Sequence, residues 1–343
     1  MVNNKKTEIN ENNMTDPKLQ KALKECQKTV LTSLKALTTS CSSSSTSSSD
    51  IPPALGDVVG QLLAQLRQSI TALGLSFNPP ITIDAAIQQL GKISEYIGKL
   101  ISCVLLATTP STELLAEEWK EGLISVVEET NKHTRVLEEN GDYLSSTGIV
   151  WESIDSLLND LSKDEPSALK RRWKVHQSTV KDAWQEFKEL LESASDDKGK
   201  EDENENVNED GEDGWDELDL GGEALSEEER KRAEVAKPLL ALHQILHSTI
   251  PKFLDQLNQN DYRRILQIST DFVNAYDNAV SSMHPEQDES EIEGALLEVE
   301  DSSRKMAGMF KDKSIEKWTE RLESEKKKWE ERRLDLSSLK DAI

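Results

Sequence analysis

The stretch AAIQQLGKISEYIGKLISCVL, residues 85–105, carries apolar side chains at intervals of three and four positions. This spacing indicates an α-helix, because it gathers side chains on one face of a 3.6-residue repeat. The apolar stripe is wide enough to contact helices on more than one side. It consists of Ile87, Leu90, Ile93, Ile97, Leu100, Ile101, Val104 and Leu105. We therefore predict a buried helix here and expect it to be the central helix of a bundle.

The same spacing recurs along most of the chain and predicts an all-α fold. No segment of useful length alternates with the two-residue period of a β-strand. Before residue 195, the pattern predicts helices over residues 17–37, 55–73, 85–105, 110–139, 150–161 and 167–191. After residue 225, it predicts helices over residues 226–250, 262–283, 290–310 and 314–339.

Several residues are typical of helix ends or interruptions. Thr109 before Pro110 suits a helix start, because the hydroxyl can cap free N–H groups while proline tolerates the first turn. Pro238 is expected to kink or restart its helix, because it lacks an N–H group. Two serine–glutamate pairs have the three-residue spacing of a capping box, namely Ser226 with Glu229 and Ser290 with Glu293.

With 343 residues, the chain has room for two ordinary domains. We predict a disordered N-terminus over residues 1–16 and an N-terminal helical bundle over residues 17–193. An acidic disordered linker over residues 194–225 would follow, and then a C-terminal helical segment over residues 226–343 that ends in a long charged helix. A run rich in serine and threonine, residues 38–50, is expected to form a flexible loop within the first bundle.

The predicted linker holds a concentration of negative charge. Residues 196–223 contain fourteen acidic residues against two lysines, so this segment carries half of the formal net charge of −24. A segment of such charge density does not pack into a core. Trp215, Leu218 and Leu220 lie among these acids in the manner of a short docking motif. A solvated linker without a binding role is the alternative interpretation.

Composition also limits the partners and the compartment. A net charge of −24 repels phosphate backbones and anionic lipid headgroups, so we expect no nucleic-acid or membrane partner and favour protein partners. Three widely separated cysteines do not resemble a disulfide framework, which fits a reducing compartment. Residues 1–13 are polar and do not resemble a signal peptide, and the apolar run over residues 97–107 is too short to span a bilayer.

The residue patterns give little support for catalysis. His243 and His247 lie four apart and could face one metal ion, but no third ligand follows at the spacing of a zinc protease. His176 lies on an apolar helix face, where a core histidine is the usual interpretation. The basic cluster from Lys170 to Lys174 is interpreted as a solvated helix face. We therefore expect no catalytic residue, no metal and no cofactor.

The order of several short motifs resembles the cyclin-D-binding protein family, known as GCIP, HHM or Maid. Val150 and Trp151 are followed by a short helix and by Leu-Ser-Lys-Asp at residues 161–164. Next comes Val180-Lys181-Asp182-Ala183, with acids following. Downstream, the acidic linker and the block around Pro238, residues 235–242, are similar to the second conserved block of that family. The resemblance spans about residues 83–310.

This resemblance implies helical bundles like those of vinculin and catenin, built as up-and-down helices. It also implies binding to cyclin D and other regulators in the nucleus and cytoplasm, with an effect on cell-cycle progression or transcription. Two alternatives stay open: a structural adaptor of the catenin or vinculin type, and an acidic chaperone that binds basic proteins through the linker. The oligomeric state also stays open.

Three serines close to acidic residues are candidate phosphorylation sites. Ser226 precedes three glutamates, and Ser193 and Ser195 lie just before the acidic segment. Acidophilic kinases prefer such surroundings, and added phosphate would extend the negative charge of the linker.

Overall fold

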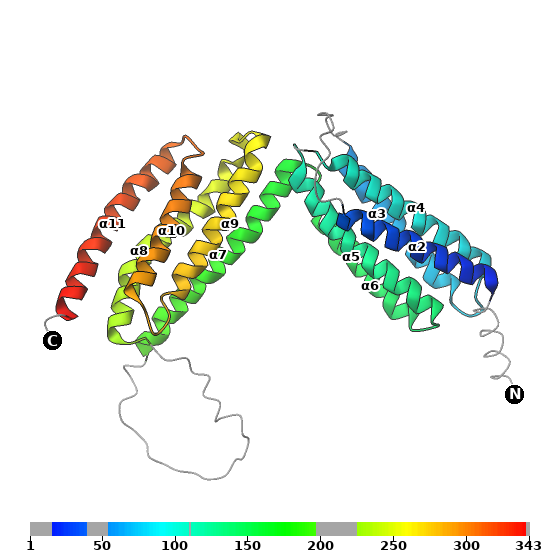
Figure 1. The fold of residues 1–343 in the computed structure, drawn as a ribbon, viewed down its shortest axis with the longest axis horizontal. Coiled ribbons are helices and arrows are strands. Elements are labelled where there is room, and N and C mark those ends of the chain that lie inside the picture. Colours follow the sequence, from blue (N-terminus) through cyan, green and yellow to red (C-terminus); the bar gives the residue numbers. More distant parts are fainter. Residues whose placement is uncertain (1–15, 40–53, 110, 197–224, 341–343) are drawn as a thin grey trace, which may run out of the picture. The chain divides into compact units, whose positions relative to one another are not determined.

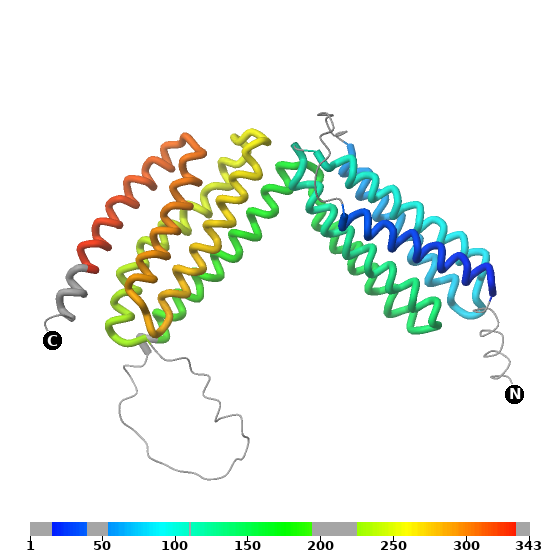
Figure 2. Tube along the Cα trace, in the orientation of Figure 1, coloured from blue at the N-terminus to red at the C-terminus, as the bar shows by residue number. Residues whose placement is uncertain are grey.

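The structure is a computed structural model that describes residues 16–39, 54–109, 111–196 and 225–340. Throughout these ranges the chain forms α-helices and two single turns of 3-10 helix, without any β-strand (Figures 1 and 2). The predicted all-α fold is thereby confirmed for the described residues. The chain divides into two compact units, residues 1–168 and 169–343, which we call unit 1 and unit 2.

Unit 1 is a bundle of five helices whose neighbours form a closed ring. The helices are α2 (Pro17–Thr39), α3 (Leu55–Ser76), α4 (Ile83–Ala107), α5 (Glu113–Glu138) and α6 (Tyr143–Asp160). Around the ring, α3 contacts α4, α4 contacts α2, α2 contacts α5, α5 contacts α6, and α6 returns to α3. The helices α4 and α5 also contact each other across the bundle. Every helix therefore buries one face without needing unit 2.

Helix α4 contains the apolar stretch predicted to be central. It packs against α2, α3 and α5, and α5 likewise packs against three neighbours. The side chains of Leu90, Ile93 and Ile97 are almost fully buried, whereas Leu105 is 49% exposed. The central position is therefore shared between α4 and α5, and the end of the apolar stripe reaches solvent.

Unit 2 is built around α7 to α11. Its helices are α7 (Glu165–Asp196), which begins in unit 1, α8 (Glu227–Thr249), α9 (Gln259–Ser281), α10 (Glu289–Ala307) and α11 (Lys313–Lys340). The single 3-10 turns Ile250–Lys252 and Leu254–Gln256 connect α8 to α9. Helix α10 packs on α9 and α8, and α11 packs on α8 (Figure 1).

The core of unit 2 contains a stack of rings from three helices. The imidazole of His247 in α8 lies between Trp173 of α7 and Phe272 of α9, with ring centroids 4.8 and 4.9 Å away. Tyr276, one turn along α9, contacts Phe272 and donates its hydroxyl hydrogen to the carbonyl of Leu240 at 3.3 Å. Large aromatic surfaces buried in this way are a main source of core stability.

The division at residue 168 differs from the predicted end of the first bundle at residue 193. The reason is that the apolar face of α7 packs on α8 and α9, as Trp173 does on His247. Two more contacts support this placement: His176 Nδ1 lies 2.8 Å from Ser269 Oγ, and Lys170 pairs with Asp255 at 2.6 Å. The sequence pattern identifies the helix but does not show which unit covers its apolar face.

Some predicted helix ends need correction. The helix predicted to begin at Val150 begins at Tyr143, because the Asp142 carboxylate accepts a hydrogen bond from the Ser145 amide at 3.2 Å. The capping box predicted at Ser290 is wrong, since Asp288 caps α10 by accepting from the amides of Ser290 and Glu291. The box of Ser226 and Glu229 is confirmed, with both reciprocal hydrogen bonds present.

Two further predictions concern α5 and α8. Helix α5 begins at Glu113, and the residue before it, Thr112, makes no capping hydrogen bond with its side chain. The cap predicted for Thr109 is therefore wrong. Helix α8 is continuous through Pro238, so the helix does not restart there.

Several predicted segments lie outside the described residues. They are the N-terminal residues 1–15, most of the run over residues 38–50, and residues 197–224 of the predicted linker. The predicted docking residues Trp215, Leu218 and Leu220 lie in the last of these segments.

Candidate functional site

The connection between α6 and α7 ties three helices of unit 1 together. The Glu118 carboxylate in α5 accepts hydrogen bonds from the amide and hydroxyl of Ser162, at 2.8 and 2.9 Å. The Trp119 indole donates to the carbonyl of Ser162 at 2.9 Å. Lys163 pairs with Asp57 of α3 at 2.7 Å. The Leu-Ser-Lys-Asp motif at residues 161–164 therefore fixes the connection against α3 and α5.

Glu165, the first residue of α7, caps the start of α5. Its two carboxylate oxygens accept hydrogen bonds from the amides of Leu114 and Leu115, at 3.0 and 2.9 Å. The residue is only 4% exposed. A carboxylate at a helix N-terminus satisfies free N–H groups and interacts favourably with the helix dipole. This contact replaces the threonine cap that the sequence predicted.

The motif residues Val150 and Trp151 have different structural roles. Val150 is 1% exposed and belongs to the core of unit 1. Trp151 is half-buried, and the Arg67 guanidinium of α3 lies 5.2 Å from the centre of its ring. Arg67 also makes two hydrogen bonds to Asp155, one turn further along α6, at 2.7 and 2.9 Å. A cation over an indole combined with a paired carboxylate holds α3 against α6.

One end of the contact between α3 and α6 exposes large apolar side chains. Leu75 of α3 is 70% exposed and Leu144 of α6 is 68% exposed. They belong to the same end of the bundle, because the neighbouring rings of Phe77 and Tyr143 lie 6.4 Å apart. We call Leu75 and Leu144 the α3–α6 apolar end. A contiguous exposed apolar patch is typical of a surface that binds another protein, whereas single exposed leucines are common on protein surfaces.

The remaining motif residues lie in unit 2. Val180 and Ala183 are buried on α7, whereas Lys181 and Asp182 between them are exposed. Pro238 is exposed on α8. The Val-Lys-Asp-Ala motif thus combines two core contacts with two charged side chains that face solvent.

The histidines considered as metal ligands make hydrogen bonds to different serines. His243 Nδ1 lies 2.8 Å from Ser303 Oγ, and His247 Nε2 lies 2.9 Å from Ser269 Oγ. Burial lowers the pKa of His243 to about 4 and that of His247 to about 3. Both imidazoles are therefore neutral at pH 7 and connect helices within the core.

Ser269 is shared by two histidines, since His176 Nδ1 contacts the same hydroxyl at 2.8 Å. A hydroxyl has one hydrogen to donate and two lone pairs that can accept, so it donates to at most one of the two imidazoles. His247 Nδ1 is buried without a hydrogen-bond partner. In folded proteins, buried N–H groups without a partner are rarer than under-satisfied acceptors. If the hydrogen were on Nδ1, His247 would have such an N–H group. This favours the tautomer in which His247 Nε2–H donates to Ser269.

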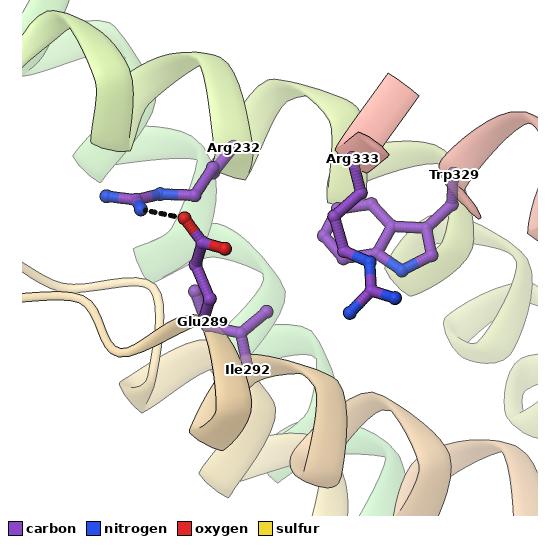
Figure 3. A pocket seen from close by; sticks show the side chains of 5 residues that line it. All are labelled: Arg232, Glu289, Ile292, Trp329 and Arg333. Carbon is purple, nitrogen blue, oxygen red and sulfur yellow. Dashed lines mark hydrogen bonds and ion pairs between the residues drawn. The ribbon is translucent and has the colours of Figure 1, made fainter. Parts of the chain in front are cut away.

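A pocket lies where α8, α10 and α11 meet (Figure 3). Arg232 comes from α8, Glu289 and Ile292 from α10, and Trp329 and Arg333 from α11. Arg232 pairs with Glu289 at 2.9 Å, which is the contact drawn as a dashed line. Ile292 and Trp329 are almost completely buried. Both arginines already bind glutamates, because Arg333 pairs with Glu293, so the pocket offers no unpaired positive charge.

A second pocket, which encloses about 50 Å³, shares Trp329 with the first and reaches His243. In the lining of this pocket, Glu300 of α10 binds Lys326 of α11 at 2.9 Å. Glu300 also binds Arg304 at 2.8 Å. Burial raises the pKa of Glu300, but the hydrogen bonds from Lys326 and Arg304 outweigh this effect and leave the pKa lowered. The carboxylate therefore stays charged and fastens α11 to α10.

Two of the three candidate phosphorylation sites can be located. Ser193 is exposed near the end of α7 and donates its hydroxyl hydrogen to the carbonyl of Leu190 at 3.0 Å. Ser226 is exposed before α8, where its hydroxyl donates to Glu229 at 2.7 Å. Ser195 lies in the last turn of α7, but its side chain is outside the described residues.

The described residues lack two features, a cluster of metal ligands and a membrane-spanning helix. Nowhere in these ranges do three histidine, cysteine, aspartate or glutamate side chains come close enough to hold a metal ion. None of the helices in the same ranges combines the length and the apolar character that crossing a bilayer requires.

Taken together, the described residues define an all-helical bundle protein whose buried polar groups join helices. Residues 58–193 match the family model described as Grap2 and cyclin-D-interacting, N-terminal. This match supports the family that the motif order suggested, and it covers α6, the connection at residues 161–164 and most of α7. It covers less than half of the chain, and the block around Pro238 lies outside it. Comparison with curated proteins found no match.

Sequence reasoning missed the residues that hold unit 1 together. Glu165 gave no local signal as a cap, because it lies about fifty residues from the amides it binds. Arg67 and Asp155 are likewise distant in sequence. The sequence contains one weak indication that Leu75 is exposed. Leu75 lies beside the apolar stripe formed by Leu66, Ile70 and Leu73, and is not part of that stripe.

Proposed function

We propose that this chain is a non-enzymatic helical interaction protein that binds regulatory proteins, with D-type cyclins as the first candidates. The observation that carries this proposal is the match of residues 58–193 to the Grap2 and cyclin-D-interacting family model. Binding of such partners would influence cell-cycle progression or transcription. The proposal places the protein in the nucleus and cytoplasm, where these partners act.

The exposed apolar surface supports a binding role for the matched residues. Most of the exposed large apolar side chains of the described residues lie within or at the edge of residues 58–193. They are Val58, Leu75, Leu105, Leu106, Leu144, Ile149 and Val175. We propose that the α3–α6 apolar end, Leu75 and Leu144, forms part of the cyclin-binding surface. Burying exposed apolar side chains against a partner is favourable, at about 25 cal/mol for each Å² of apolar surface removed from water.

The chemistry of the buried histidines supports a non-enzymatic role. His133, His243 and His247 are buried, and burial lowers their pKa values to about 4, 4 and 3. A general base works best with a pKa near the operating pH. These histidines instead contact Ser146, Ser303 and Ser269, each on another helix.

Affinity purification from native extract, followed by mass spectrometry, tests the class of partner. Full-length protein is compared with a variant that carries Leu75→Glu and Leu144→Glu. Recovery of cyclin and kinase subunits with the first protein but not with the second is the expected result. Recovery of actin-associated proteins would favour a catenin-type adaptor instead, and recovery of histones would favour an acidic chaperone.

We also propose that an acidophilic kinase phosphorylates Ser193, Ser195 and Ser226. The exposure of Ser193 and Ser226 supports this proposal. Mass spectrometry of native protein should find phosphate on at least one of the three serines. Spectra that cover all three and contain only unmodified peptides would contradict it.

A further inference from the structure

Helices α9 and α10 of unit 2 are neighbours (Figure 1). A groove lies between residues 271–278 of α9 and residues 297–305 of α10. It is a shallow depression open to solvent, with a volume of about 480 Å³, and is lined by Asp271, Asn274 and Asn278 from α9 and by Leu297, Glu298 and Asp301 from α10. Its floor is made of Ala275 and Ser302, two small side chains that are buried. Small floor residues leave a hollow, because neither side chain fills the space between the two helices. We call this surface the α9–α10 groove.

Leu297 is the apolar feature of the α9–α10 groove. It is 50% exposed, whereas Ile292, Leu296 and Val299 on the same helix are almost fully buried. A Cβ atom on Gly294, one turn before Leu297, would meet nothing within 4 Å. The surface of α10 one turn before Leu297 is therefore open, and half of the Leu297 side chain itself is exposed to solvent. A side chain from another molecule can reach this leucine without displacing any part of unit 2.

The charges around Leu297 are mostly negative. Glu298, Asp271 and Asp301 contribute three carboxylates to the lining, and Lys305 contributes one ammonium group. Lys305 is held by Asp301, with Nζ 2.5 Å from a carboxylate oxygen, and Asp271 adds to the attraction. Lys305 and Asp301 are both more than half exposed. An exposed pair of this kind has little net strength and exchanges partners readily.

We propose that the α9–α10 groove binds a basic amphipathic helix of a partner protein. The groove between two packed helices has the shape that accepts a third helix, which lays its apolar face along the groove. An apolar side chain of the partner contacts Leu297. Lysine or arginine side chains contact Glu298, Asp271 and Asp301, and one of them replaces Lys305 at Asp301. The groove lies outside residues 58–193, so this inference does not depend on the proposed cyclin binding.

The probe is a fluorescein-labelled synthetic peptide of about 18 lysines and leucines with helical spacing, a length that gives about five helical turns. Its binding to the full-length protein is measured by fluorescence anisotropy. Leu297→Asp is expected to weaken binding about tenfold, which corresponds to the loss of one good apolar contact. The matched control is Ile245→Asp, since Ile245 is 52% exposed on α8, away from the groove lining. This control is expected to leave the affinity within about twofold, as it removes no contact.

A charge test separates the groove from general attraction to an acidic chain. Glu298→Lys with Asp301→Lys is compared with Glu316→Lys and Glu320→Lys, two exposed positions on α11. Both double variants change the net charge by the same amount. If the peptide binds in the groove and is not merely attracted by the net charge, only Glu298→Lys with Asp301→Lys should abolish binding. Lys305→Gln should strengthen binding about threefold, because the peptide no longer competes with Lys305, while Lys317→Gln on α11 should have a smaller effect.

Thermal unfolding of each variant shows whether unit 2 stays folded. Since Leu297, Glu298, Asp301 and Lys305 are exposed, their replacement should leave the melting temperature almost unchanged. Loss of affinity in the groove variants alone supports the inference. Equal loss in the α11 or Ile245 variants, or failure of the unmodified protein to bind the peptide at low salt, would overturn it.

Discussion

Gly56 of α3 lies against the backbone of Lys163, so that a Cβ atom on Gly56 would be 2.8 Å from the Lys163 carbonyl oxygen and 2.9 Å from its Cα. Backbone atoms cannot move aside as the end of a side chain can. The Gly56–Lys163 contact therefore requires glycine. It lets the connection between α6 and α7 approach the start of α3, where Lys163 binds Asp57.

Gly56→Ala should destabilise unit 1, because the added methyl group separates α3 from the connection. We expect the free energy of unfolding to fall by about 1–3 kcal/mol, the usual cost of overpacking. The matched control is Gly98→Ala in α4, where a Cβ would meet nothing within 4 Å. Alanine in an open helical position should stabilise by up to about 1 kcal/mol. Urea denaturation measures the free energy of unfolding of both variants. An equal change in Gly56→Ala and Gly98→Ala would contradict the close contact inferred for Gly56.

Glu165→Gln should weaken the start of α5. Glutamine keeps one acceptor oxygen and loses the charge, so one of the amides of Leu114 and Leu115 loses its partner. Loss of such a cap costs about 0.5–2 kcal/mol. Glu121→Gln, at an exposed position of α5, is the control and should change stability little. Hydrogen exchange of the Leu114 and Leu115 amides provides a local measurement, and unchanged protection would argue against capping by Glu165.

The buried histidines predict that stability falls in mild acid. Burial lowers the pKa of His133 and His243 from 6.5 to about 4, and that of His247 to about 3. Below pH 6.5 the unfolded chain binds protons that the folded chain excludes. Stability is therefore full at pH 7 and decreases between pH 6.5 and about 4, by on the order of 1 kcal/mol per pH unit for each histidine.

Unfolding in urea at several pH values between 7 and 4.5 measures this dependence. The variant His243→Gln removes one of the three groups and should show a shallower slope, even though its stability at pH 7 is lower. The same slope in the variant and the unmodified protein would show that His243 does not contribute. Carboxylates titrate mainly below this range, because their ordinary pKa values are near 4.

Glu300→Ala should loosen α11. The carboxylate is shared by Lys326 and Arg304, and its side chain is only 14% exposed. Removing one partner of a largely buried charge cluster costs about 1–3 kcal/mol. We expect faster hydrogen exchange in α11 and a lower melting temperature. Glu291→Ala, at an exposed position of the same helix α10, should produce neither change. If the backbone amides of α11 exchange as slowly in Glu300→Ala as in the unmodified protein, Glu300 is not needed to hold α11. The apolar contacts of Trp318 and Leu322 then suffice.

The sequence predicts the helices well, because helical periodicity is a local property. The stripe that contains Trp173, Val180 and Phe187 correctly identifies α7. The pattern does not show that this apolar face packs on α8 and α9. The same residue spacing would be found whichever apolar surface covered the face. The predicted unit boundary at residue 193 differs from the observed one at residue 168 for this reason.

The contacts of the candidate sites could not be predicted in the same way. Pairs such as Arg67 with Asp155 and Glu165 with Leu114 join residues that are far apart in the chain. Many acidic and basic residues of this sequence have suitable chemistry, so residue type alone does not select the pair. The Ser226 capping box was predictable, because all its atoms lie within one helical turn.

The most direct measurement of the central claim is the binding of purified full-length protein to a purified D-type cyclin by isothermal titration calorimetry. We predict saturable binding that is weakened at least about tenfold by Leu75→Glu with Leu144→Glu, the loss expected when apolar anchors leave an interface centre. The control Leu31→Glu, at a position 44% exposed on α2 outside the matched residues, should bind as tightly as the unmodified protein. Absence of heat and of complex formation at high micromolar concentrations of the folded protein would contradict the claim.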